Sequence, residues 1–133
     1  MEEKKIQVVH LQMVKDQEII YGEQVLDNPR ETAALVKSLI GSMDRECLVV
    51  CATDTKMKPT YIQIVGIGTI NYCPVSIPEV FKAVLLSNSA NILLAHNHPS
   101  GDCTPSSDDL VFTERVMRAA DLLGIRLIDH IIV

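Results

Sequence analysis

The sequence has few aromatic residues and no excess of positive charge. Its 133 residues include no tryptophan, three tyrosines and two phenylalanines, which is too few to build a platform on which nucleic-acid bases stack. Lysine and arginine together number 12 against 17 aspartates and glutamates, so the formal net charge is −5. Because sequence-independent binding to DNA or RNA depends on clustered lysine and arginine, the composition argues against direct nucleic-acid binding.

The chain also lacks a long hydrophobic run and a signal peptide. No stretch approaches the roughly 18 apolar residues of a membrane span, and the opening residues Met1 to Lys5 do not form the basic segment that begins a secretory signal. The four cysteines, at positions 47, 51, 73 and 103, form no C-x-x-C pair, as is usual for free thiols in a reducing compartment. These absences predict a cytoplasmic protein with no membrane association.

What the sequence does contain is enough for one globular domain. Apolar residues make up 47% of it, and a chain of this length can bury roughly 68% of the surface that its unfolded form exposes. Such a domain needs no disulfide or metal in order to fold, so any metal would serve chemistry. No repeat or linker divides the sequence, which predicts a single domain over residues 1–133 with a hairpin and a helix in 1–44 and the functional core in 45–133.

Hydrophobic periodicity predicts strands that alternate with three helices. The helices are expected from Pro29 to Gly41, from the S-x-x-E capping box at Ser76 to Asn88, and over a longer segment that ends at Gly124. Nearly continuous apolar runs predict buried strands, and looser alternation predicts others. The expected strands cover residues 46–53, 61–70, 92–95 and 125–133, preceded by a hairpin over 6–21. The pattern is that of an α/β domain in which helices cover a mixed sheet.

Two histidines and an aspartate predict a metal site. His96 and His98 follow an expected strand, and strand residues two apart project from the same face. Asp109 comes eleven residues after His98, in the first turn of the long helix, so the intervening loop can bring its carboxylate back to the histidines. Two neutral imidazoles and one carboxylate are the ligand set of a catalytic zinc site whose fourth position holds water.

Each of these residues also has a structural interpretation. Ser106 lies three positions before Asp109 on the same helix face, so its hydroxyl can point at the metal-bound water or a substrate oxygen, but S-x-x-D also fits a helix capping box. A histidine next to a proline at a strand end, as His98 is, is commonly a turn residue. A zinc hydrolase also needs a proton carrier; Glu46, where a buried strand begins, is the candidate by position, and an exposed strand-end glutamate is the alternative.

The complete pattern resembles a known family. His96-x-His98 with Ser106 and Asp109 is similar to the JAMM signature of the JAB/MPN metalloprotease domain, and the string AHNHPSGDCTPS looks like the version in RadC-like proteins. The resemblance covers most of the chain and includes the final segment DHIIV, where His130 either supports the metal site or packs in the core. It implies a fold similar to the cytidine deaminases, with a mixed sheet between helices in three layers.

The resemblance also implies roles for the candidate residues. It implies a zinc ion held by His96, His98 and Asp109. It assigns Glu46 as the general acid/base and gives Ser106 a part in stabilising the tetrahedral intermediate. The implied activity is zinc-dependent hydrolysis of an amide or isopeptide bond in a peptide or protein substrate that the sequence does not identify.

Other functions stay open as alternatives. The first is a non-catalytic accessory role in DNA repair or recombination, for which the RadC family is named, although the acidic balance and the absence of a helix-hairpin-helix motif count against DNA contact. A metal-free scaffold is disfavoured because all the ligands are present, and a deaminase because H-x-E and P-C-x-x-C are absent. Relatives usually continue past Val133, so we expect a minimal family member or a chain trimmed at its C-terminus; the sequence predicts no oligomeric state.

Overall fold

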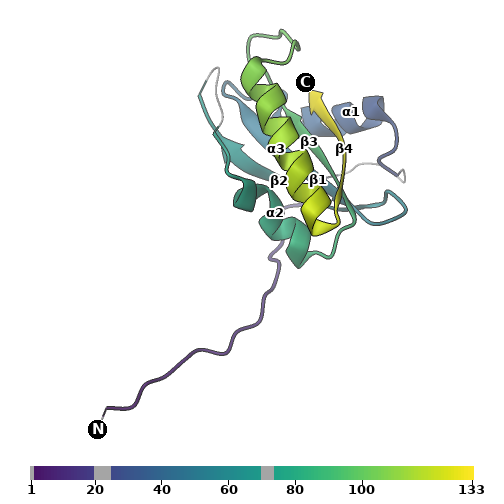
Figure 1. The fold of residues 1–133 in the computed structure, drawn as a ribbon. Coiled ribbons are helices and arrows are strands. Elements are labelled where there is room, and N and C mark those ends of the chain that lie inside the picture. The colour runs from purple at the N-terminus through teal and green to yellow at the C-terminus, as the bar shows by residue number, and fades with distance from the viewer. Residues whose placement is uncertain (1, 20–24, 70–73) are drawn as a thin grey trace.

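The computed structural model describes residues 2–19, 25–69 and 74–133, which form three helices and a four-stranded sheet. The helices are α1 (Pro29–Ile40), α2 (Ile77–Leu86) and α3 (Ser107–Leu123), and the strands are β1 (Cys47–Thr53), β2 (Pro59–Ile67), β3 (Asn91–His96) and β4 (Arg126–Ile132). The strand order is β2-β1-β3-β4, with β3 and β4 parallel and the other neighbours antiparallel. This is the predicted α/β domain with a mixed sheet (Figure 1). None of the described helices is long and apolar enough to cross a membrane.

Helices cover both faces of the sheet. All seven residues of β1 are buried, and their side chains alternate between the two faces. Leu48 and Val50 belong to a core cluster with residues of α2 and α3, whereas Val49 and Cys51 belong to a second cluster with residues of α1. Figure 1 shows α3 crossing in front of the sheet and α1 on its far side. The molecule therefore has the predicted three layers.

Capping boxes begin both helices on the front face, as the sequence predicts. The Ser76 backbone N–H donates to the Glu79 carboxylate at 3.0 Å at the start of α2. At the start of α3 the Ser106 N–H donates to Asp109 Oδ2 at 2.8 Å, and the Asp109 N–H donates to Ser106 Oγ at 3.0 Å. Each pair of bonds satisfies helix-terminal N–H groups that have no partner inside the helix.

The three cysteines that the structure describes are free thiols, as predicted. Cys47 and Cys51 are buried in the cluster beneath α1, and burial raises the pKa of the Cys51 thiol to about 12. Cys103 is exposed in the loop before α3. Cys73 lies outside the described residues.

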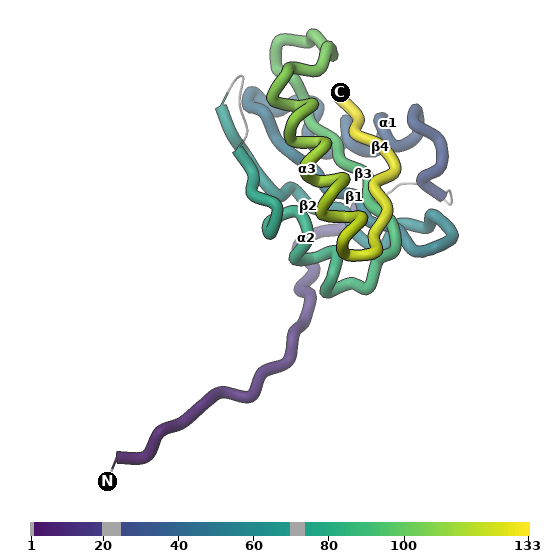
Figure 2. Tube along the Cα trace, in the orientation of Figure 1, coloured from purple at the N-terminus to yellow at the C-terminus, as the bar shows by residue number. Residues whose placement is uncertain are grey.

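The N-terminal region differs from the prediction. Residues 2–19 contain no strand and form an extended arm that runs away from the domain (Figure 2). Its apolar side chains from Ile6 to Val14 are exposed, with Ile6 at 92% and Val8 at 98%, and only Ile19, at the end of the arm, packs against the core cluster that contains residues of α1. The predicted hairpin is therefore wrong over this segment, because a two-stranded hairpin is at best marginally stable unless it packs on another element. Tyr21, at the end of that hairpin, and Ile70, at the end of an expected strand, lie outside the described residues.

Candidate metal centre

The sheet topology brings together residues that lie far apart in the sequence. Strand β1 is antiparallel to β3, with Leu48 opposite His96. Continuing this register places Glu46, just before β1, beside His98, just after β3. The loop after β3 leads into α3, whose first turn carries Asp109 at the same edge. The site thus lies at the carboxyl ends of the parallel strands β3 and β4, where α/β sheets commonly bind ligands.

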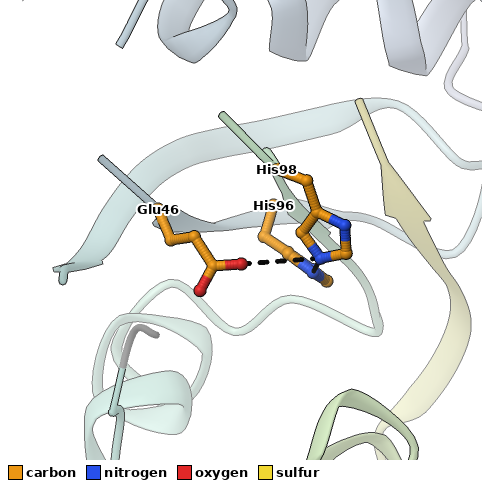
Figure 3. A group of neighbouring side chains, drawn as sticks. All are labelled: Glu46, His96 and His98. Atoms are coloured by element: carbon orange, nitrogen blue, oxygen red, sulfur yellow. Dashed lines mark hydrogen bonds and ion pairs between the residues drawn. The ribbon is translucent and has the colours of Figure 1, made fainter. Parts of the chain in front are cut away.

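Nitrogen and oxygen atoms converge at this edge. The Nε2 atoms of His96 and His98 are 2.8 Å apart, and Asp109 Oδ2 lies 3.4 Å from the first and 3.2 Å from the second. Glu46 Oε1 lies 3.5 Å from His98 Nε2, and Figure 3 shows its carboxylate pointing toward the two imidazoles. Ligand atoms of Glu46, His96 and His98 all lie within 4.8 Å of one another. The structure therefore gathers the predicted ligands and the predicted proton carrier in one place.

Of the two carboxylates, Asp109 fits the position of a third ligand better. Ligand atoms of a tetrahedral zinc ion lie about 3.3 Å from one another, given bonds of about 2.0–2.1 Å. Asp109 Oδ2 has this spacing to both histidine nitrogens. Glu46 Oε1 lies 3.5 Å from His98 Nε2 and within 4.8 Å of a ligand atom of His96, so its carboxylate is beside the histidine nitrogens but is less evenly spaced from them.

The hydrogen bond of His98 suits it to metal binding. His98 Nδ1 lies 2.6 Å from the backbone carbonyl oxygen of Asp102, and a carbonyl can only accept a hydrogen bond. Nδ1 therefore carries the hydrogen, and in the neutral ring the Nε2 lone pair points into the site. A bond of this kind to the other ring nitrogen is typical of metal-binding histidines. The donor set of this chain fits a zinc ion.

The pKa values of the two carboxyl groups are shifted in opposite directions. Glu46 is only 8% exposed, and burial raises its pKa, as does the charge of Asp109, against an opposing effect of His98. Burial also acts to raise the pKa of Asp109, but the hydrogen bonds from Ser106 and the charges of the two histidines outweigh it and hold that pKa below its usual value. The carboxyl with the raised pKa, Glu46, is therefore the better suited of the two to take up and release a proton, and the one with the lowered pKa, Asp109, is the better suited to stay ionised beside the histidines. The alternative of an exposed strand-end glutamate is wrong.

Asn97 holds the backbone on both sides of Glu46, a role that the sequence pattern did not predict. Its buried side chain accepts a hydrogen bond from the Cys47 N–H at 2.7 Å and donates one to the Arg45 carbonyl at 2.8 Å. On the opposite side, the Glu46 N–H donates to the Thr69 carbonyl at 2.7 Å. The only signal for this role in the sequence is the place of Asn97 between the two candidate ligand histidines.

His130 lies against the site rather than simply in the core. Its Nε2 is 2.7 Å from His96 Nδ1, and its Nδ1 contacts the Thr113 hydroxyl on α3. Burial, together with the charge of His96, lowers the pKa of His130 to about 4, so the ring is neutral at pH 7. Burial is also the main cause of a lowered pKa at His96. Of the two interpretations of His130, the structure favours support of the site.

A cavity of about 720 Å³ opens beside these residues. Its walls combine the candidate site with apolar side chains, and include Glu46, His96, Ser106, Asp109, Val75 and Phe112. Concave sites with a few polar groups among apolar walls are the usual form of a binding pocket. The candidate site can therefore be reached by a substrate larger than water.

Comparisons with known proteins identify the family to which the chain belongs. Residues 26–133 match the family model of the RadC-like JAB domain. Similar proteins include UPF0758 proteins of Roseiflexus castenholzii (41% identical over 106 residues, 80% of this chain and 46% of the relative), Moorella thermoacetica (39% over 109 residues, 82% and 48%) and Carboxydothermus hydrogenoformans (40% over 113 residues, 84% and 50%). The chain spans about half the length of these curated relatives. Since the family match extends over most of its length, the chain belongs to the RadC-like JAB domain family.

Proposed function

We propose that the protein is a cytoplasmic zinc-dependent hydrolase that cleaves an amide or isopeptide bond in a peptide or protein substrate. The observation that carries the proposal is the convergence of His96, His98 and Asp109 beside a buried glutamate. In this assignment the three residues hold the zinc ion, Glu46 transfers the proton, and Ser106 stabilises the charge that develops on the substrate carbonyl.

Glu46 has the position of a general acid/base, and burial shifts its pKa upward, the direction that suits this role. A zinc ion held by the three ligands would supply a Lewis acid and a water molecule that ionises near pH 7. The Glu46 carboxylate, 3.5 Å from His98 Nε2, would accept the proton from the attacking water and then donate it to the leaving nitrogen. Its raised pKa favours this use, because proton transfer is most efficient when the pKa of the carrier lies near the working pH.

Ser106 can donate a hydrogen bond into the cavity. Its Oγ accepts from the Asp109 N–H at 3.0 Å, which uses a lone pair of the hydroxyl and leaves its hydrogen free. Ser106 lines the cavity next to Asp109. A fixed donor aimed at a developing oxyanion is commonly worth about 10²-fold or more in rate.

The experiment compares the wild type with Glu46→Gln. The wild type, purified without chelator, should contain about one equivalent of zinc and should cleave members of a peptide and isopeptide library. Glu46→Gln should keep its zinc and lose about 10²- to 10⁴-fold in rate, the usual contribution of general acid–base catalysis.

Glu79→Gln is the matched control, because Glu79 lines the same cavity without lying among the candidate ligands. It should retain both zinc and activity. A wild type that contains no zinc, or a Glu46→Gln variant as active as the wild type, would contradict the proposal.

A further inference from the structure

The two neighbours of the Thr113 hydroxyl determine which of them accepts its hydrogen bond. Thr113 Oγ1 lies 2.7 Å from the backbone carbonyl oxygen of Asp109, one turn earlier in α3. A carbonyl can only accept, and a hydroxyl has one hydrogen, so Thr113 donates to Asp109. Toward any other neighbour, Thr113 Oγ1 can act only as an acceptor.

The direction of this hydrogen bond fixes which ring nitrogen carries the hydrogen in His130 and, in turn, in His96. Thr113 Oγ1 also contacts His130 Nδ1, so that Nδ1 must carry the hydrogen. A neutral imidazole carries a single ring hydrogen, so with that hydrogen on Nδ1, facing Thr113, the His130 Nε2 holds a lone pair. His130 Nε2 lies 2.7 Å from His96 Nδ1, which must then be the donor.

The outcome is a His96 ring with hydrogen on Nδ1 and a free lone pair on Nε2. That Nε2 is the atom that lies 2.8 Å from His98 Nε2 and 3.4 Å from the Asp109 carboxylate. His98 Nε2 also holds a lone pair. The two Nε2 atoms and Asp109 Oδ2 are therefore three hydrogen-bond acceptors that lie close together, and a cation between them would stabilise this arrangement.

We propose that Thr113 and His130 are positioning residues: they hold His96 in the one tautomer that can bind the metal. The inference rests on the proposed zinc site but concerns residues outside the ligand set. We call the two residues the Thr113–His130 relay. It joins α3, β4 and β3, so it orients the His96 ring as well as its hydrogen. Loss of such a partner of a metal-binding histidine typically lowers metal affinity by about 10- to 100-fold.

The test uses Thr113→Val, which keeps the shape of the side chain and removes the acceptor, with Thr113→Ser as the control that restores the hydroxyl. In Thr113→Val the His130 hydrogen should move to Nε2 and donate to His96 Nδ1, which places the His96 hydrogen on the ligand atom Nε2. Competition of zinc ion against a chromogenic chelator should show affinity about 10- to 100-fold lower in Thr113→Val and near the wild-type value in Thr113→Ser.

Long-range proton–nitrogen correlation spectra provide a readout that needs no metal. In the wild type, His96 and His130 should each carry hydrogen on Nδ1, and in Thr113→Val this pattern should change. A second pair of variants repeats the test at the next position: His130→Gln keeps a side-chain acceptor for His96, whereas His130→Leu removes it and should bind zinc more weakly.

The outcomes separate this inference from the proposed function. If the wild type binds zinc and Thr113→Val binds it equally well, the relay is refuted and the hydrolase proposal stands. If the wild type binds no zinc, the proposed function fails, and the ring-nitrogen pattern still decides the relay. A wild-type His96 without hydrogen on Nδ1 overturns the relay under either result.

Discussion

Helices α2 and α3 begin with nearly the same capping motif, but only the one in α3 lies beside the histidines. Both cover the same face of the sheet, and both begin at a serine followed three residues later by an acidic residue, Ser76 with Glu79 and Ser106 with Asp109. Both acidic side chains accept a hydrogen bond from the backbone N–H of the serine. Only Asp109 also lies within 3.4 Å of two imidazole nitrogens.

The difference comes from the strand that precedes each helix. The loop before α3 follows β3, which ends at His96, and carries His98, whereas α2 follows a segment that supplies no such side chains in its described part, residues 74–76. The capping interpretation and the ligand interpretation of Asp109 are therefore compatible, since one carboxylate accepts the Ser106 N–H and also lies beside both histidines. A local motif fixes where a helix begins, and its surroundings decide whether the same side chain has a second use.

The largest difference between the two helices should appear in zinc content when each capping carboxylate loses its charge. Asp109→Asn keeps an oxygen that can accept from the Ser106 N–H but loses the anionic ligand, so bound zinc should be lost, whereas Glu79→Gln should retain about one equivalent. Elemental analysis of both purified proteins checks this. Zinc retained in Asp109→Asn would show that Asp109 acts only as a capping residue.

Removing the two hydrogen bonds from the Asn97 side chain to the backbone around Glu46 should weaken the candidate site and leave both capping boxes intact. Asn97→Ala leaves the buried Cys47 N–H and the Arg45 carbonyl without their partner, and should reduce the free energy of unfolding by about 1–3 kcal/mol for each group left unsatisfied. Zinc affinity and the hydrolysis rate should fall with it, because Glu46 is no longer held in place.

The matched control for Asn97→Ala is Asn91→Ala, at the opposite end of β3. Asn91 Nδ2 donates to the Asp54 carbonyl at 3.0 Å, far from the histidines in the strand. This variant should lose stability in urea unfolding without a change in zinc affinity. Equal effects of both variants on zinc would show that Asn97 acts only through overall stability.

Removing either capping serine hydroxyl should lower stability by a similar amount, but only one of the two changes should slow hydrolysis. Ser106→Ala and Ser76→Ala each remove the side chain that begins a helix, at a cost of about 1 kcal/mol. Only Ser106→Ala should also slow hydrolysis, by about 10²-fold, because only Ser106 has a donor free beside the candidate ligands. Thermal unfolding and rate measurements on the zinc-loaded proteins test the pair.

The smallest effect is expected where α3 ends. Gly124 has φ of 73°, and a Cβ added there would meet no atom within 4 Å, so Gly124→Ala should cost only the backbone strain of about 1 kcal/mol. Asn88, after α2, also has a positive φ of 54°, and Asn88→Gly should leave stability unchanged or slightly raise it. Zinc content should not change in either variant.

The sequence predicted most of the fold because its signals are local. Proline, serine and glycine at helix ends, and apolar runs in β1 and β3, each act over a few residues, and the structure confirms them. The hairpin over 6–21 failed in residues 2–19 because alternation shows that a segment can form a strand and not that a partner exists for it. The ligands could be proposed from H-x-H and Asp109.

Positions that depend on strand order could not be predicted from periodicity. Glu46 lies beside His98 only because β1 neighbours β3 with Leu48 opposite His96. Its position in the sequence made it a candidate, and only the resemblance assigned it the proton transfer. Thr113 was not predicted at all: its hydroxyl matters only because β4 places His130 next to it. Such contacts become visible only when the tertiary arrangement is known.

The central place of β1 and β3 in the sheet has a consequence for motion. Glu46 and His96 are attached to the two inner strands, whose core residues are buried and hydrogen-bonded on both sides. Segments of this kind exchange their amide hydrogens only when a whole domain unfolds, whereas helix ends open far more often. Asp109 and Ser106 lie at such an end. One half of the site is thus carried by the two inner strands, and the other half by the first turn of α3, where faster amide exchange is expected.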